Sequence, residues 1–164
     1  MMLKGINPLL GPDLLSVLRA MGHGDEIAIV DANYPAEAHA ERCLRADGHS
    51  VAIMLEALLS VLPLDRLVAA AAFRPVPPDA AGRKVHREFD AIVAKYEPGL
   101  HVVALSGDAF YQRVKSAYAI IATGERRFYG NIILRKGVID EDIEPIPERS
   151  QRATRRHDIG RVAV

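Results

Sequence analysis

Residues 21–31 read MGHGDEIAIVD, and this stretch decides the fold. The run over 27–30 is too short for a helix and rich in isoleucine and valine, which predicts an inner strand of a sheet. The apolar residues over 12–21 recur at helical spacing, with Pro12 suited to the first turn and Gly22 to the C-terminal cap. A helix exit carrying His23 and a strand end carrying Asp31 are positions where α/β proteins place binding sites.

Helical and extended patterns alternate through most of the remaining chain. Residues 36–46 fit either a helix or a loop leading into a short strand, and 74–82 reads as a proline-rich loop. The alternation predicts an α/β domain of three layers, α/β/α, around a mostly parallel central sheet. The last two strands have no helix between them, so we expect them to pair antiparallel and make the sheet mixed. The expected helices cover 51–62, 83–96 and 108–116 (Asp108 as N-cap), and the expected strands cover 67–73, 101–105, 118–123 and 131–135.

Length and composition limit the class of protein. The chain has 164 residues, of which 49% are hydrophobic, and this fits one domain with a substantial core. Its 21 basic and 21 acidic residues balance, which argues against a general affinity for nucleic acid or for an anionic membrane. We expect no membrane span and no signal peptide. A single cysteine, Cys43, excludes an internal disulfide and fits the reducing cytoplasm.

The last residues differ from the rest in character. We expect residues 1–139 to form the domain and 140–164 to be a charged C-terminal extension with little apolar periodicity. Such a segment is typical of a mobile tail, or of an arm that becomes ordered on a partner subunit.

Three residues of the opening stretch are candidates for chemistry. Taken singly, His23 could be a polar residue whose cationic form suits the negative end of a helix, Asp25 a turn residue and Asp31 a strand cap. Read together, they favour a site. Imidazole titrates near neutral pH, and a carboxylate at the end of a strand can bind a hydroxyl or orient an imidazole.

A second candidate lies between the last two expected strands. The segments 123–125 (TGE) and 129–131 (YGN) could be an ordinary polar hairpin loop, with Gly124 and Gly130 serving backbone needs. They could also form a rim of hydroxyl and amide groups that binds a polyol, with Tyr129 stacked on the face of a sugar.

Other chemistries receive less support from the residues. A metal site on His23, Asp25, Asp31 and His39 is conceivable, but their spacing matches no known ligand pattern. The chain has no Gly-x-Ser-x-Gly motif for a serine hydrolase. Residues 106–108 follow a strand and could meet a phosphate, although the acidic Asp108 opposes an anion there.

Taken together, seven short motifs in order resemble the family of L-fucose mutarotases and D-ribose pyranases. The similarity covers roughly residues 2 to 139. The motifs are Lys4-x-Ile6-x-Pro8-Leu9, Met21-Gly22-His23-Gly24-Asp25-Glu26, Asp31-Ala32-x-x-Pro35, Arg45-Ala46-Asp47-Gly48, Ala109-Phe110-Tyr111, Thr123-Gly124-Glu125-Arg126 and Tyr129-Gly130-Asn131-Ile132.

The resemblance implies an isomerase that interconverts the ring forms of a free monosaccharide, with no metal and no organic cofactor. His23 falls on the family's proton donor and Asp31 on its substrate-binding aspartate, with Asp25 and Glu125 as supporting residues. Tyr129, Gly130 and Asn131 fall on the sugar-contacting segment, which an adjacent subunit supplies in ring-shaped members. Bacterial relatives form decamers of two stacked pentamers, so a closed homo-oligomer with a shared site is implied.

The sequence departs from the family pattern at two positions. Fucose-type members carry a sugar-binding arginine just before the Ala-Phe-Tyr helix, where this chain has Ser106-Gly107-Asp108. Asn33 replaces a histidine common after Asp31-Ala32. These changes leave the sugar open, and they keep a second hypothesis, a sugar-binding or regulatory protein without turnover. A third, a metal hydrolase on His23, Asp31 and His39, would require a bound metal.

Overall fold

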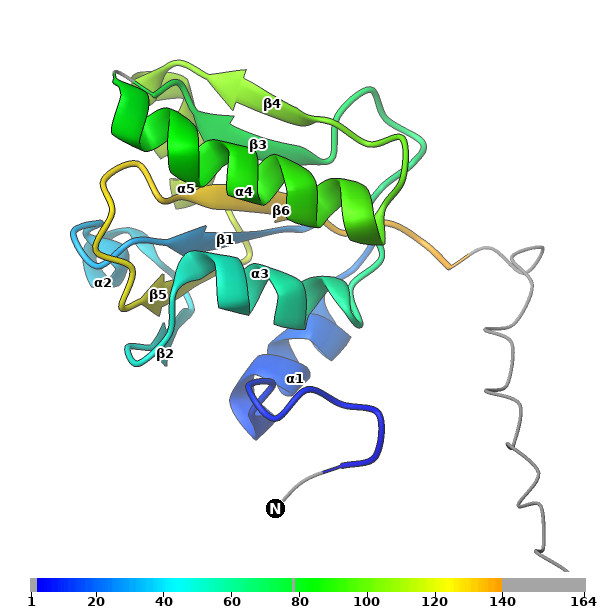
Figure 1. Cartoon of the computed structure of the whole chain (residues 1–164). Helices are drawn as coiled ribbons and strands as arrows, with labels where there is room; N and C mark the ends of the chain where they lie inside the picture. The colour runs from blue at the N-terminus through cyan, green and yellow to red at the C-terminus, as the bar shows by residue number, and fades with distance from the viewer. Residues whose placement is uncertain (1–2, 78, 140–164) are drawn as a thin grey trace, which may run out of the picture.

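A six-stranded sheet with helices on both faces forms the molecule (Figure 1). The structure is a computed structural model and describes residues 3–77 and 79–139. The expected C-terminal extension therefore lies outside the described residues. In chain order the elements are α1 (Pro12–Ala20), β1 (Glu26–Val30), α2 (Ala36–His39), β2 (Cys43–Ala46), α3 (Val51–Leu59), β3 (Ala72–Pro75), α4 (Ala80–Tyr96), β4 (Val102–Leu105), α5 (Gly107–Lys115), β5 (Ala119–Thr123) and β6 (Ile132–Arg135).

The strand order is β2-β5-β1-β6-β3-β4. Strand β1 pairs parallel with β5 and antiparallel with β6, and β3 pairs antiparallel with β6 and parallel with β4. Strand β2 pairs parallel with β5. Five strands thus run in one direction and β6 alone runs in the other, which confirms the predicted mixed, mostly parallel sheet.

The predicted inner strand lies at the centre of the sheet because both of its faces are covered. Ile27 and Ile29 pack into a core with residues of α1, α3 and α4, whereas Ala28 and Val30 pack on the opposite face with residues of α5. All four side chains are fully buried. A strand covered on both faces reads as a continuous apolar run, which explains the pattern of residues 27–30.

Three expected boundaries were wrong, the first of them for a local reason. The strand expected over 67–73 is β3, and it begins only at Ala72. The carboxylate of Asp65 accepts a hydrogen bond from the backbone N–H of Leu67 and holds the preceding residues in a turn. Asp108 lies inside the first turn of α5, and the N-cap is Ser106. The loop expected over 74–82 is also shorter than predicted, because its first two residues belong to β3 and its last three to α4.

The expected pairing of the last two strands was also wrong. Strands β5 and β6 run antiparallel but are not neighbours, because β1 lies between them. The segment between them therefore crosses the end of β1 and is not a hairpin loop. This brings the polar residues after β5 and before β6 to the carboxyl end of β1. The ambiguous stretch 36–46 contains both the helix α2 and the strand β2.

A membrane span is not among the described elements: none of these helices is both long and apolar enough to cross a bilayer.

Candidate functional site

The candidate binding site lies where the parallel strands end. Asp31 follows β1, and its backbone N–H donates to Asn131 Oδ1 at 2.8 Å, while Asn131 Nδ2 donates to Asp31 Oδ2 at 2.9 Å. Asp31 Oδ1 accepts from the N–H of Asn33. Both Asp31 and Asn131 are buried. Burial raises the pKa of Asp31 above its ordinary value, against the opposing effect of these hydrogen bonds. We call this end of the sheet the Asp31 edge.

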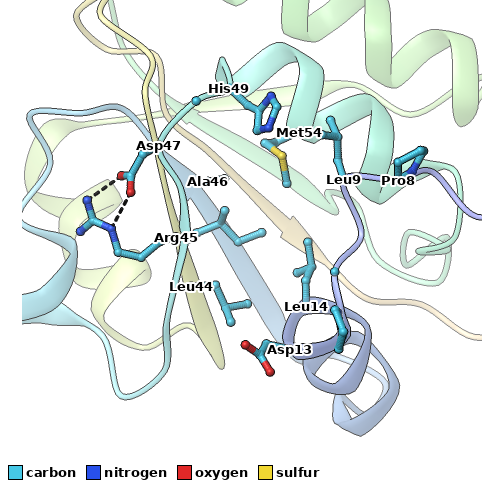
Figure 2. A pocket seen from close by; sticks show the side chains of 14 residues that line it. Pro8, Leu9, Asp13, Leu14, Leu44, Arg45, Ala46, Asp47, His49 and Met54 are labelled. Carbon is cyan, nitrogen blue, oxygen red and sulfur yellow. Dashed lines mark hydrogen bonds and ion pairs between the residues drawn. The ribbon is translucent and has the colours of Figure 1, made fainter. Parts of the chain in front are cut away.

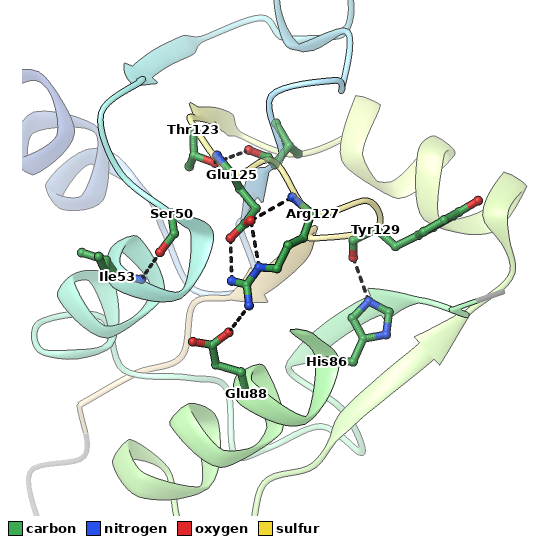
Figure 3. Close-up of polar contacts among 9 residues, drawn as sticks. Ser50, Ile53, His86, Glu88, Thr123, Glu125, Arg127 and Tyr129 are labelled. Atoms are coloured by element: carbon green, nitrogen blue, oxygen red, sulfur yellow. Dashed lines mark hydrogen bonds and ion pairs between the residues drawn. The ribbon is translucent and has the colours of Figure 1, made fainter. Parts of the chain in front are cut away.

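The loop over 124–131 is held in place by a buried carboxylate (Figure 3). Glu125 accepts from Arg127 Nε at 2.9 Å, from its terminal nitrogen at 2.7 Å and from its backbone N–H at 3.0 Å. Arg127 also donates to Glu88 of α4. Burial would raise the pKa of Glu125, but the bonds from Arg127 outweigh it and hold the pKa below its ordinary value. Glu125 therefore stabilises the loop as an anion.

Tyr129 is presented by the same loop and lies half-exposed at the Asp31 edge. Its φ of 62° is in the left-handed region, which is uncommon for a bulky residue. Its carbonyl accepts a 2.7 Å hydrogen bond from Nε2 of the buried His86 on α4 (Figure 3). Burial lowers the pKa of His86, so a neutral imidazole holds this carbonyl. Gly130 follows, where a Cβ would stand 2.8 Å from the side chain of Glu125.

A cleft of about 220 Å³ opens between these residues and α5. Aromatic rings dominate its wall, and Tyr34 stacks on Tyr111 with ring centroids 5.2 Å apart. Polar groups come from Asp31, Asn33 and Asn131. An apolar wall with a few fixed polar groups is typical of a site for a small ligand with hydroxyl groups. The full lining is Asp31, Asn33, Tyr34, Pro75, Val76, Gly107, Phe110, Tyr111, Phe128, Tyr129 and Asn131.

His23 lies at the opposite end of β1. Its Nε2 is 3.0 Å from Oδ2 of Asp65, a buried carboxylate that also accepts from Arg135 Nε at 3.0 Å. Arg135 ends β6 and faces Glu26, the first residue of β1, in the antiparallel register. We call this end, with His23, Asp65 and Arg135, the His23 edge.

The two edges are separated within one chain. Strand β1 has five residues, and at about 3.3 Å per residue it places its ends roughly 16 Å apart. The structure therefore groups Asp31 with Tyr129 and Asn131, whereas the sequence analysis had grouped Asp31 with His23. A small ligand bound at Asp31 would therefore not reach the imidazole of the same chain.

Asp25 stays close to His23 but does not contact its ring. Its Oδ2 accepts from the backbone N–H of Gly22 at 2.7 Å, and its own N–H donates to the carbonyl of Gly22. It closes the turn that carries His23.

The set considered for a metal is dispersed. His39 Nδ1 is bonded to the hydroxyl of Tyr34 at 2.9 Å, and His23 lies at the other edge. Over residues 3–77 and 79–139, no three His, Cys, Asp or Glu side chains are placed to share an ion.

The Arg45–Gly48 motif borders a separate hollow of about 420 Å³ between β2 and α1 (Figure 2). Arg45 forms a forked ion pair with Asp47 that projects away from the apolar floor (Figure 2). The backbone of this turn supports the loop over 124–131, which we call the binding loop. The N–H of Gly124 donates to the carbonyl of His49, and a Cβ on Gly124 would overlap the carbonyl oxygen of Asp47.

Three residues of these networks were missed from the sequence: Asp65, Arg127 and His86. The fold brings Asp65 to His23 and His86 to Tyr129, which are far apart in sequence. Arg127 lies two residues from its partner, Glu125. An acidic residue in a Leu-Asp-Arg context after Pro63 gave no signal of a contact with His23.

Comparisons with known proteins match most of the chain. The model of the RbsD / FucU transport protein family matches residues 4–139. An L-fucose mutarotase of Actinobacillus pleuropneumoniae is 42% identical over 140 residues, covering 84% of this chain and 97% of that protein. The fucose mutarotase of Streptococcus pneumoniae, solved in complex with L-fucose, is 39% identical with a TM-score of 0.79 over 84% of this chain and 100% of that chain.

A second solved structure, FucU from Bifidobacterium longum, is 38% identical with a TM-score of 0.78. The match spans 84% of this chain and 100% of that chain. The family similarity inferred from the seven motifs is confirmed, and the chain belongs to the RbsD / FucU family.

Proposed function

We propose that the protein is a mutarotase that interconverts the ring forms of a free monosaccharide. The observation that carries this proposal is the fixed Asp31–Asn131 pair at the mouth of an aromatic-walled cleft. The relatives named mutarotases, one of them solved with L-fucose, support a sugar of this class.

The chemistry requires little more than proton transfer. A cyclic sugar changes anomer by opening to its carbonyl form and closing on the other face. Opening needs a proton at the ring oxygen and removal of one from the anomeric hydroxyl. His23 would exchange the first proton, and water or a second group would take the other. A positioned acid or base typically contributes about 10²–10⁴-fold, which suits a reaction that is already moderately fast.

The remaining residues would bind and orient the sugar. Asp31 accepts hydrogen bonds from sugar hydroxyls, and Asn131 keeps its carboxylate in place. Tyr129 lies beside the cleft with its ring available to a sugar face, and Gly130 lets the loop approach Glu125 closely. No metal or organic cofactor enters this scheme.

The site would be completed by a second copy of the chain. Because the whole length of β1, roughly 16 Å, separates His23 from Asp31, a sugar at the Asp31 edge needs the His23 edge of a neighbour. Contact between two different edges is heterologous, and it forms a ring when the rotation between neighbouring copies closes. The pentamer-based decamer implied by the family resemblance is one such assembly. The lone cysteine, Cys43, supports placing the enzyme in the cytoplasm.

Exchange NMR on the anomeric protons of L-fucose, D-ribose and related sugars tests the activity. We expect faster exchange with the protein, and a loss of about 10²–10⁴-fold in His23→Ala. Absence of acceleration for every sugar would overturn the enzyme reading. Equal rates for wild type and His23→Ala would remove His23 from the mechanism.

Mixing two inactive variants tests the shared site. His23→Ala and Asn131→Ala chains combined in equal amounts should recover up to about a quarter of wild-type activity, since that share of ring sites receives both intact residues. Native mass spectrometry confirms that the subunits have exchanged. Exchanged subunits without recovery would mean that one chain supplies the whole site.

The second candidate is a sugar-binding or regulatory protein without turnover. It is favoured by the cleft position of Gly107 and Asn33. The family resemblance implies an arginine within the stretch 106–108 and a histidine in place of Asn33 in fucose-type members. Calorimetry that shows sugar binding in a protein without anomer exchange would establish it.

A further inference from the structure

We propose that Asp65 is a positioning residue that fixes the neutral imidazole of His23 as its Nε2–H tautomer, leaving Nδ1 as the atom that exchanges protons with the sugar. This inference rests on the proposed function for its consequence, but the tautomer itself is a property of the protein alone.

The contact joins a buried carboxylate to an accessible imidazole. His23 Nε2 and Asp65 Oδ2 are 3.0 Å apart, within hydrogen-bond distance. The side chain of Asp65 is 0% exposed, whereas that of His23 is 44% exposed. One end of the ring is therefore tied to the protein interior while a large part of the ring faces outward.

Asp65 can only accept a hydrogen bond from the ring. Its Oδ1 accepts from the N–H of Leu67 and its Oδ2 from Arg135 Nε, both at 3.0 Å. Burial would raise the pKa of Asp65, but the bonds from Arg135, Leu67 and His23 outweigh it, so the pKa lies below the ordinary value. An ionised carboxylate has no proton to donate, so the proton in this contact belongs to Nε2.

The backbone around Asp65 is fixed by the end of β6. The N–H of Asp65 donates to the carbonyl of Arg135 at 3.1 Å, and Leu64 forms an isolated bridge with Lys136. The carboxylate is thus held by the sheet itself, and its contact with Nε2 sets the orientation of the imidazole.

The Nδ1 atom is left for chemistry. Among the described residues it has no hydrogen-bond partner within the chain. In the neutral ring its lone pair accepts a proton. In the imidazolium, Nδ1–H gives that proton to the ring oxygen as the bond from the anomeric carbon to that oxygen breaks. The anomeric hydroxyl loses its proton to water, and the open carbonyl form results. A carboxylate on the far nitrogen stabilises the imidazolium and fixes its orientation, as in other His–Asp pairs.

Asp25 provides a matched control. It is a second carboxylate within two residues of His23, but it accepts from the backbone N–H of Gly22 and not from the ring. Its substitution by asparagine removes a neighbouring charge without removing the contact to Nε2.

Magic-angle-spinning NMR of protein labelled with ¹³C and ¹⁵N histidine reads the tautomer in an assembly of any size. The signal of His23 is assigned by its loss in His23→Gln. At a pH where the ring is neutral, we expect Nε2–H in wild type and in Asp25→Asn, and loss of this preference in Asp65→Ala. An Nδ1–H tautomer in wild type overturns the proposal without any variant, as does an unchanged tautomer in folded Asp65→Ala.

Kinetics then separate positioning from binding. In Asp65→Asn we expect kcat to fall about 10-fold or more, though no further than in His23→Ala, with KM within about twofold. If no sugar is turned over, the proposed function fails while the NMR result still decides the tautomer. If Asp65→Asn changes only KM, the positioning role is wrong and the activity stands.

Discussion

At the scale of single residues, Tyr129 combines an unfavourable backbone conformation with a side chain that the proposed site would use to contact the sugar. A left-handed φ costs an L-residue roughly 1–2 kcal/mol, whereas asparagine adopts this region more readily. Because the Tyr129 side chain is half-exposed, Tyr129→Asn should unfold at an equal or higher temperature than wild type while KM for the sugar rises.

Differential scanning calorimetry and anomer-exchange kinetics measure the two effects. Tyr129→Phe, which keeps the ring, is the control and should change KM less. A Tyr129→Asn protein that is clearly less stable than wild type would contradict the assignment of backbone strain to this residue.

Glu125 makes the stability of the binding loop depend on pH. Its pKa is held below the ordinary value of 4.5, so the folded protein retains the anion more strongly than the unfolded chain does. Its stabilising contribution is complete above pH 4.5 and is lost as the pH falls through the lower folded value. Glu125→Gln should therefore be less stable than wild type at pH 7, by about 1–2 kcal/mol, with the difference vanishing in acid.

Urea unfolding at pH 7 and at pH 3 measures this difference. Glu88→Gln removes only the half-exposed partner of Arg127 and should cost less than about 0.5 kcal/mol. A deficit of Glu125→Gln that is the same at both pH values would mean that the carboxylate charge is not what stabilises the loop.

At the scale of elements, the turn after β2 packs against the loop after β5 only because Gly124 has no side chain. A Cβ at Gly124 would overlap the carbonyl oxygen of Asp47, and backbone cannot move aside as a flexible side chain can. Gly124→Ala should destabilise the protein by about 1–3 kcal/mol and weaken sugar binding, since Glu125 follows directly. Gly48, with open space around it, is the control, and Gly48→Ala should be close to neutral.

Thermal unfolding of the two alanine variants decides the matter. Equal melting temperatures for Gly124→Ala and Gly48→Ala would show that the turn and the loop do not constrain each other.

The elements themselves were largely predictable because their patterns are local. Strand β1 is a short β-branched run, and α1 has helical spacing with Pro12 at its start. Strand β3 was misplaced because Leu67 looks like a strand residue but is held in a turn by the Asp65 carboxylate. The order of strands was missed because short connections suggest neighbours, whereas β1 pairs with both β5 and β6.

The partners of the site residues were less predictable. Motifs indicated Asp31 and Asn131, and the fold joins them by two hydrogen bonds across a hundred positions of sequence. Nothing local to Asp65 or His86 indicates that one meets His23 and the other holds Tyr129. Such contacts depend on strand order, which spacing along the chain does not report.

At the scale of the whole molecule, apolar side chains are exposed at both edges that the proposed site needs. Leu67 is 75% exposed and follows Asp65 at the His23 edge. Phe128 is 70% exposed and lines the cleft at the Asp31 edge. Large exposed apolar residues beside polar site residues are typical of surfaces that contact another protein. A head-to-tail contact between these two edges would bury both residues and bring His23 to the sugar of the next copy.

Leu67→Glu and Phe128→Glu should therefore weaken assembly and activity together. A charge at either position would be buried against an apolar surface of the neighbouring copy, so dissociation should appear at a higher protein concentration than in wild type. Val103→Glu on β4 is the matched control, because Val103 is 38% exposed and lies within the outer strand of the sheet. Sedimentation velocity and anomer exchange over a dilution series compare the three variants, with circular dichroism to confirm folding. If Leu67→Glu and Phe128→Glu kept full activity as folded monomers, one chain would supply a complete site and the head-to-tail ring would be wrong.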